Sequence, residues 1–216
     1  MDLNEALYTT RAMRRVKPDP IPDVVVQSML DAAVRSPSGS NSQNWRWLTV
    51  TDRSTMAELG KLYVEAWDEL NATFYAGARE AAISRGDKTL LRIMSSSQWL
   101  ADNFKDTPLV VLPYHRNDPT GASIYPAIWS LMLAARSHGV GTTLTTVLGM
   151  FRPTEVAELL GVPLDKGWQN AAAIPCGYPL GRWGIAKRAP VHKVVYEEQW
   201  GAAPEWTVDE PLWTER

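Results

Sequence analysis

The stretch at residues 124–148 reads IYPAIWSLMLAARSHGVGTTLTTVL and carries the strongest fold signal in the chain. Its apolar residues recur at helical spacing: Ile124, Ala127, Ile128, Leu131, Met132 and Ala135. Trp129 and Leu133 make the other faces apolar too, which predicts a helix buried in a core or at a dimer interface. Gly139 marks the expected helix end, and the Thr-rich run at 141–148 predicts a strand.

Short helices and strands alternate on both sides of this stretch. Patterns of apolar residues and caps predict helices at 2–10, 23–36, 56–70 and 153–160, and strands at 45–51, 109–112 and 171–176. The polar region onward to Trp99 shows no clear period, and we expect an irregular excursion there. Because no regular βαβ period emerges, an α+β fold is favoured over a doubly wound sheet. No repeat or linker divides residues 1–216, which predicts a single domain.

Composition and charge exclude several classes of protein. The net charge of −2 over 216 residues provides no long-range attraction for nucleic acid or an anionic membrane. Apolar runs are far shorter than the ~20 residues that span a bilayer. The only cysteine, Cys176, has no partner for an internal disulfide, and the N-terminal residues lack a signal-peptide pattern. A cytoplasmic location is therefore expected.

Common catalytic motifs are missing. His115, His138 and His192 are isolated in the sequence, so no metal site is expected. There is no Gly-x-Ser-x-Gly nucleophile motif, and Gly139-Val-Gly141 lacks the third glycine of a dinucleotide fingerprint. No side chain is singled out as a general acid or base.

Basic residues instead point to an anion site. Arg11, Arg14 and Arg15 crowd five positions before a proline-rich segment, and Lys187-Arg188 forms a second basic pair. Taken alone, the arginine run is better explained as a solvated charge cluster, because surface arginine clusters are common. Together with the Ser/Gly/Asn loop at 37–42 and the Thr-rich run, these groups suit a phosphorylated polar ligand.

Three of these motifs resemble those of the nitroreductase family, which includes iodotyrosine deiodinase. They are the run 10–15 followed by Pro20-Ile21-Pro22-Asp23, the loop PSGSNSQNW at 37–45, and Gly177-Tyr178-Pro179 with Lys187-Arg188-Ala189-Pro190-Val191. The resemblance implies an α+β fold, with a mostly antiparallel sheet flanked by helices, in an intertwined homodimer. It also implies FMN bound at the dimer interface, with residues of both chains around each flavin.

The resemblance carries cofactor roles onto individual positions. Arg11 and Arg14 resemble the family's N-terminal pair that grips the phosphate, the ribityl chain and the O2 edge of the flavin, and Arg188, beside Lys187, resembles its C-terminal phosphate ligand. The loop residues Pro37, Ser38, Ser40 and Asn41 match the segment along the isoalloxazine, while Thr145 and Thr146 fall near flavin N5, Thr146 being the candidate donor. The family's usual Arg-Arg-Ser-x-Arg has Thr10 and Ala12 here, and Arg15 is expected to compensate.

The implied reaction is ping-pong hydride transfer. NAD(P)H reduces the flavin at N5, leaves, and is replaced by a nitroaromatic, quinone or similar planar acceptor. Reductive dehalogenation or another specialised flavin reaction is an alternative, and a non-catalytic flavin-binding protein is another. A lid-like excursion at about 63–104 contains Tyr63, Trp67, Phe74, Tyr75, Trp99 and Phe104. These rings either cover a planar acceptor or pack in a helical core.

Tryptophan is unusually abundant, with 10 residues against 7 Tyr and 3 Phe. Trp200, Trp206 and Trp213 lie in a tail with little core pattern. We expect a C-terminal arm at about 192–216 to wrap the partner subunit and bury them there, because indole rings favour interfaces.

Overall fold

The computed structural model describes residues 1–214, and its contacts divide the chain into two compact units. A central unit comprises Ala12–Gly181. A terminal unit joins Met1–Arg11 to the segment that begins at Arg182. Each unit is described by itself below, and the single domain expected over 1–216 stays a prediction.

The central unit is built on a five-stranded antiparallel sheet, in which β4 pairs with the C-terminal end of β2. The strand order along the main path is β1-β2-β5-β3. The strands are β1 Trp45–Val50, β2 Leu109–His115, β3 Gly141–Thr142, β4 Gln169–Asn170 and β5 Ile174–Gly177. Together with the helices on both faces, this sheet confirms the α+β prediction.

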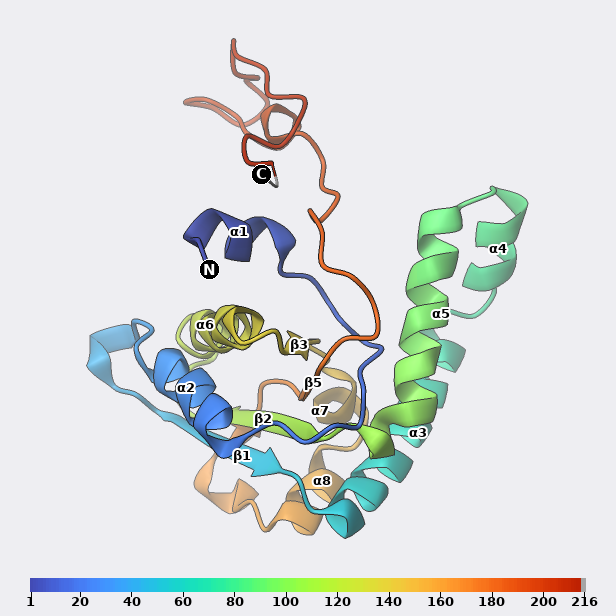
Figure 1. The fold of residues 1–216 in the computed structure, drawn as a ribbon, viewed down its shortest axis with the longest axis vertical. Helices are drawn as coiled ribbons and strands as arrows, with labels where there is room; N and C mark the ends of the chain where they lie inside the picture. The colour runs from blue at the N-terminus through green and yellow to red at the C-terminus, as the bar shows by residue number, and fades with distance from the viewer. Residues whose placement is uncertain (215–216) are drawn as a thin grey trace. The chain divides into compact units, whose positions relative to one another are not determined.

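Two helical layers cover the sheet (Figure 1). On one face lie α2 Asp23–Val34 and α6 Ile124–Ser137, which pack on Val111 and Ile174. On the other face Val110 and Leu112 join a second core. That core is formed with α3 Arg53–Phe74, α5 Lys88–Asn103, α7 Val147–Phe151 and α8 Pro153–Leu160. Successive side chains of β2 therefore point to opposite faces of the sheet and belong to two separate cores, as the pleat of a strand requires.

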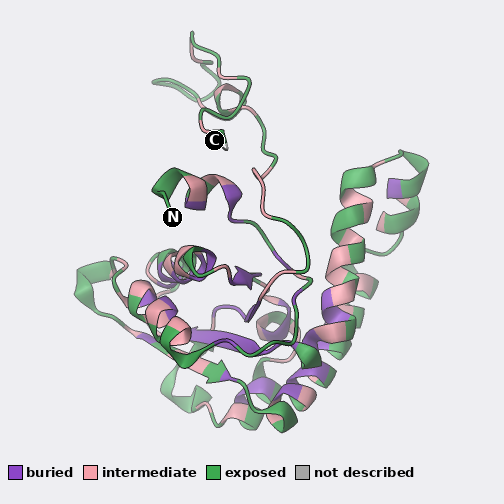
Figure 2. Ribbon diagram, in the orientation of Figure 1, coloured by how far each residue is buried: buried purple, intermediate pink, exposed green. Residues whose placement is uncertain are grey.

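The excursion expected to be irregular is helical, so that prediction was wrong. The helix α3 continues to Phe74, α4 spans Ala78–Ser84, and α5 follows. The Asp87 carboxylate caps α5 by accepting a hydrogen bond from the Leu90 backbone N–H. Much of α4 and α5 is exposed (Figure 2), so apolar residues are sparse there, although Leu90, Met94 and Ala101 recur on one face of α5.

The Thr-rich strand expected at 141–148 is also much shorter than predicted. Only Gly141–Thr142 forms β3, which lies at the end of the strand order. Thr145 makes one isolated bridge to Ala173, and the chain then turns into α7. The threonines at 143, 145 and 146 therefore lie in the connection from β3 to α7, where tertiary packing overrides their preference for strands.

The terminal unit holds α1 Leu3–Thr9 and a short 3₁₀ turn at Val191–Lys193. The Tyr8 and Trp213 rings lie 5.7 Å apart, and the Trp206 indole donates to Glu197. Trp200 is 93% exposed in the single chain. Burial of this arm against a second subunit stays a prediction.

Candidate functional site

The segment that carries Arg14, residues 13–17, packs directly against Gly141 and Gly177 of the sheet. Its backbone N–H groups at Met13 and Lys17 donate to the carbonyls of Thr142 (2.9 Å) and Tyr178 (2.8 Å). An added Cβ at Gly141 would lie 2.7 Å from the Met13 Cβ, and one at Gly177 would lie 2.7 Å from the Val16 Cβ. Only glycine permits so close a crossing, so Gly141 and Gly177 set the position of the arginine segment.

A cavity of about 460 Å³ opens beside this segment. Many of its lining residues come from α3 and α5, two helices that lie side by side in Figure 1. Its volume falls within the range of small-molecule sites. Aromatic and aliphatic side chains dominate the part lined by the helices. The lining residues are Arg14, Tyr63, Trp67, Asn71, Tyr75, Gly77, Arg79, Glu80, Leu90, Ile93, Met94, Ser97, Gln98, Leu100, Thr143, Leu144, Thr145 and Val147.

Arg14 is the half-buried cation of the cavity wall. Its Nη1 donates a long hydrogen bond of 3.3 Å to the Ser96 hydroxyl on α5. Burial lowers the pKa of its guanidinium, which nevertheless stays charged because an arginine starts far above neutral pH. Within residues 1–214 it forms no ion pair with a carboxylate. The cavity therefore presents a cation whose remaining N–H groups suit an oxygen-rich or anionic ligand.

Two threonines near Arg14 differ in their hydrogen bonding. The Thr145 hydroxyl pairs with the Tyr63 hydroxyl at 3.1 Å. Burial raises the pKa of Tyr63, whose ring stacks on Phe104 with centroids 4.2 Å apart. By contrast, the Thr143 hydroxyl is buried and has no hydrogen-bond partner in the described chain. A buried unpaired hydroxyl costs free energy, and Thr143 is also one of the residues that line the cavity.

The Ser/Gly/Asn loop holds an unusual backbone. Ser40, Asn41 and Gln43 all have φ near +50°, which is rare and strained for residues other than glycine. The loop is held by hydrogen bonds from the Gln43 backbone N–H to the Ser38 hydroxyl and from the Gly39 backbone N–H to the Ser123 hydroxyl. None of its residues lines the cavity of the same chain.

The structure brings only part of the predicted set to the cavity. Arg14 and Thr145 line it. The other predicted residues of the central unit do not: Ala12, Arg15, Pro37, Ser38, Ser40, Asn41 and Thr146. Arg11, Lys187 and Arg188 are exposed residues of the terminal unit, where Arg11 donates to the Arg182 carbonyl and Arg188 to the Lys187 carbonyl.

Thr146, the expected donor at N5, is turned to another partner. Its hydroxyl contacts the Met150 sulfur at 3.3 Å, one turn along α7. Thr143, which the sequence reasoning did not single out, provides the free hydroxyl instead. The available signal was the paired threonines at 142–143, but nothing in the run distinguished them from 145–146.

The aromatic residues expected in the lid-like excursion fall into two groups, one packed in the core and one lining the cavity. Tyr63 and Phe104 are buried and stacked, so for these rings the packing alternative holds, although Tyr63 also borders the cavity. Trp67 and Tyr75 line the cavity, and the Trp67 indole donates to Gln98 across the two lid helices. Phe74 is mostly exposed.

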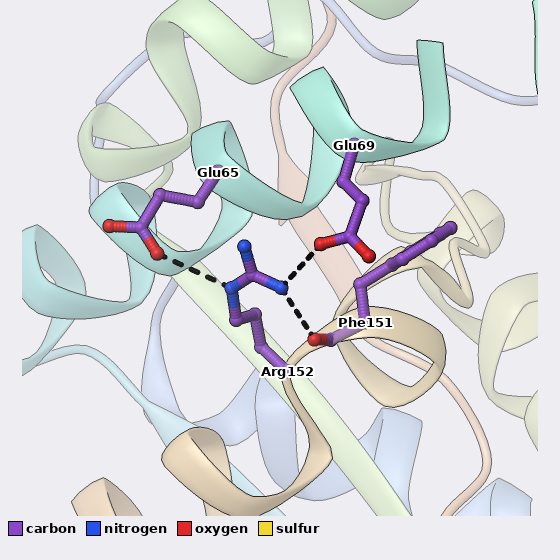
Figure 3. Close-up of polar contacts among 4 residues, drawn as sticks. All are labelled: Glu65, Glu69, Phe151 and Arg152. Atoms are coloured by element: carbon purple, nitrogen blue, oxygen red, sulfur yellow. Dashed lines mark hydrogen bonds and ion pairs between the residues drawn. The ribbon is translucent and has the colours of Figure 1, made fainter. Parts of the chain in front are cut away.

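Arg152 braces α3 from outside the cavity (Figure 3). Its Nε contacts Glu65 at 3.3 Å, and its Nη1 donates to Glu69 and to the Phe151 carbonyl, both at 2.7 Å. Glu65 and Glu69 are one turn apart on α3, so one guanidinium joins two turns of the helix to the junction of α7 and α8. The same helix presents Tyr63 and Trp67 to the cavity.

Comparison with known proteins gives consistent matches over most of the chain. The family model described as "Nitroreductase family" matches residues 7–178. A protein named NADH dehydrogenase from Thermus thermophilus is 26% identical over 90% of this chain and 95% of its own length. An iodotyrosine deiodinase from Thermotoga neapolitana is 27% identical over 82% of this chain and 87% of its own.

The fold also matches solved structures. Oxidized iodotyrosine deiodinase, bound to FMN and 3-iodo-L-tyrosine, superposes with a TM-score of 0.68 at 22% identity, over 87% of this chain and 95% of that one. In the described residues no helix is both long and apolar enough to cross a membrane. The same residues contain no cluster of three or more His, Cys, Asp or Glu side chains placed to hold a metal ion.

Proposed function

The chain belongs to the nitroreductase family, and on that premise we propose that it is an FMN-dependent oxidoreductase that uses NAD(P)H to reduce a planar acceptor. FMN supplies the hydride chemistry of such an enzyme when bound, and the protein supplies position and charge. The solved deiodinase of the same fold holds FMN, and the Thermus relative is named for NADH. A nitroaromatic or a quinone fits the aromatic lining of the cavity.

The proposal rests on two residues that line the same cavity, Arg14 and Thr143. Within residues 1–214, the cavity lining combines the half-buried guanidinium of Arg14, which has no carboxylate partner, with the buried hydroxyl of Thr143, which has no hydrogen-bond partner. The polar edge of an isoalloxazine, rich in carbonyl and nitrogen acceptors, would satisfy both groups. The residues of the cavity thus fit the cofactor that the family implies.

Each group has a proposed task. Arg14 stays protonated and stabilises negative charge that develops on the flavin edge next to it. Tyr63 holds Thr145 in place, and Thr143 donates to the ring. Trp67 and Tyr75 exclude water and stack on the acceptor or on the nicotinamide that precedes it. Arg11, Arg15, Lys187 and Arg188 are proposed to hold the phosphate and ribityl chain.

A homodimer is part of the same proposal. The strained loop at 37–44 does not line the cavity described above, and such strain is found where function requires it. We propose that Pro37, Ser38, Ser40 and Asn41 serve the flavin bound by the second subunit. The half-exposed Trp129 on α6 is then available for the subunit interface. A cytoplasmic location agrees with the single buried thiol of Cys176.

The test uses one isosteric change with a matched control. Thr143→Val removes the unpaired hydroxyl, so the apo protein should melt at the same or a higher temperature while its affinity for FMN falls several-fold. Thr145→Val removes a hydroxyl that already bonds Tyr63, so it should lower the melting temperature instead. Flavin fluorescence quenching measures the affinity. Equal FMN affinity of Thr143→Val and the parent protein would refute the assigned contact.

The redox assignment needs a separate assay. Purified protein should be yellow and release FMN on denaturation, and NADH or NADPH should bleach the bound flavin without oxygen. Bound FMN that neither nucleotide bleaches would leave only the alternative of a non-catalytic flavin-binding protein. A colourless protein that fails to bind added FMN would contradict both readings.

Reductive dehalogenation is the second candidate reaction. It is favoured by the iodotyrosine deiodinase relative and by the free hydroxyl at Thr143, since a donor at flavin N5 assists one-electron chemistry. Anaerobic reoxidation of the reduced protein by a nitroaromatic, a quinone and an iodophenol distinguishes the two. Reoxidation by the iodophenol alone, with release of iodide, would replace the leading proposal.

A further inference from the structure

Three residues that do not line the cavity, Arg46, Arg116 and Trp168, form an arginine-tryptophan patch on one face of the sheet. Arg46 on β1 pairs with Tyr114 on β2, and Tyr114 pairs with Asn170 on β4. Continuing the second register by two residues places Trp168 opposite Arg116. Because side chains alternate along strands, all of these residues project from the same face.

Both guanidinium groups of the patch stack on one indole. Their central carbons lie 5.1 Å (Arg46) and 5.0 Å (Arg116) from the centroid of the Trp168 ring. The two positive charges are therefore no more than about 10 Å apart. Cation–π attraction favours each contact, but it does not remove the repulsion between two like charges.

No carboxylate neutralises this pair of charges. Neither arginine forms an ion pair in the described part of the chain. The nearby carboxylate in sequence, Asp118, accepts instead from the backbone N–H groups of Ser123 and Ile124. The patch is thus a local excess of positive charge on a protein whose net charge is −2.

Unused hydrogen-bond donors accompany the charge. The Arg116 Nε is buried and has no partner in residues 1–214. The same holds for the hydroxyl of Tyr114, a residue only 2% exposed. Tyr114 lies on β2, between β1, which carries Arg46, and β4, which directly follows Trp168. Burial raises the pKa of Tyr114 to about 12, so at neutral pH the hydroxyl keeps its proton and remains a donor.

From this arrangement we propose that the patch binds a phosphate group. A phosphate dianion matches the two guanidinium charges, and its oxygens accept the forked N–H groups that arginine presents. Trp168 holds the two side chains extended before the anion arrives, which reduces the entropy lost on binding. The site is independent of the proposed flavin cavity, because none of its residues lines that cavity.

The experiment titrates the protein, saturated with FMN, with inorganic phosphate at constant ionic strength. FMN occupies the phosphate contacts proposed for the cofactor, and protein that binds no FMN is titrated as purified, so failure of the flavin assignment leaves this test intact. The indole ¹H–¹⁵N resonance of Trp168, identified by its loss in Trp168→Phe, reports on the patch. We expect a saturable shift of this resonance.

Variants then connect the shift to the two arginines. Arg46→Met and Arg116→Met should each weaken phosphate binding by about tenfold or more, because each removes charge-assisted hydrogen bonds. Arg85→Met, which removes an exposed arginine outside the patch, is the matched control and should leave the binding curve unchanged. Tyr114→Phe should weaken binding by a smaller factor.

A parallel titration with adenosine monophosphate identifies the source of the phosphate. Tighter binding than inorganic phosphate assigns the patch to a phosphate ester of a larger ligand, and equal binding assigns it to the free anion. A shift that does not saturate, or one that survives both Arg46→Met and Arg116→Met, would overturn the proposal.

Discussion

Replacing Gly141 by alanine tests whether close backbone crossing positions Arg14. The new Cβ would lie 2.7 Å from the Met13 Cβ, 3.2 Å from its Cγ and 3.3 Å from the Gly177 carbonyl oxygen. The first distance is shorter than real Cβ contacts, and the Met13 Cβ is not a flexible side-chain end. The arginine segment must therefore move by several tenths of an ångström. Overpacking of this kind costs about 1–3 kcal/mol.

For a chain of this length the cost corresponds to a melting temperature lower by roughly 2–12 °C. Arg14 follows Met13 directly, so its guanidinium moves relative to Thr143 and FMN affinity should fall as well. Gly177→Ala should act in the same way through Val16. Thermal unfolding followed by circular dichroism measures the first effect, and flavin fluorescence quenching measures the second.

The matched control is Gly181→Ala. No heavy atom lies within 4 Å of a Cβ built at Gly181, and its backbone lies outside the positive-φ region. This variant should melt and bind FMN like the parent protein. If Gly141→Ala behaves like Gly181→Ala in both assays, the close crossing does not position Arg14 and the reasoning fails.

Three further outcomes are expected. Arg152→Met should lower the melting temperature at low salt by more than in 1 M NaCl, where screening weakens its ion pairs; an equal loss at both salt concentrations would contradict an electrostatic brace. Cys176 should not react with a thiol reagent at pH 8 until the protein unfolds, because burial raises the pKa of its thiol; rapid labelling of folded protein would be inconsistent with this. Hydrogen bonds from Ser54 and Thr55 lower the pKa of Asp52 to about 2. The Asp52 carboxylate that caps α3 therefore stabilises the fold at pH values above the usual aspartate pKa near 4, and this stabilisation is lost as the pH falls toward 2. Asp52→Ala should remove that part of the acid dependence of the free energy of unfolding.

Local patterns predicted several elements well. The helix at 153–160 has the expected bounds, because Pro153 starts it and Gly161 ends it in the left-handed region at φ +68°. The apolar helix before Gly139 was equally clear. Side-chain caps are a weaker guide: neither Asp2 before α1 nor Pro22 before α2 makes a side-chain capping hydrogen bond. Proline and glycine act through backbone sterics, whereas a cap depends on a side-chain geometry that neighbours can change.

The lid was the main failure of sequence reasoning, and the cause is physical. The helices α4 and α5 border a cavity and solvent over much of their surface, so apolar residues are sparse in them and mark only a narrow face. Their positions depend on contacts with distant residues, such as Trp67 with Gln98 and Arg14 with Ser96. Such contacts join positions tens of residues apart, beyond the reach of any local pattern.

The α+β class and the family could be predicted from the sequence alone, because both depend on motif residues and on spacing along the chain. The sequence also singled out Arg14, which lines the cavity. The tertiary structure alone decided which threonine is free. The Thr145 hydroxyl pairs with Tyr63 of α3, and the Thr146 hydroxyl contacts the Met150 sulfur of α7. Within residues 1–214 the buried Thr143 hydroxyl has no hydrogen-bond partner. Hydrogen-bond partners come from elements far apart in sequence, so the free donor is known only once those elements have packed.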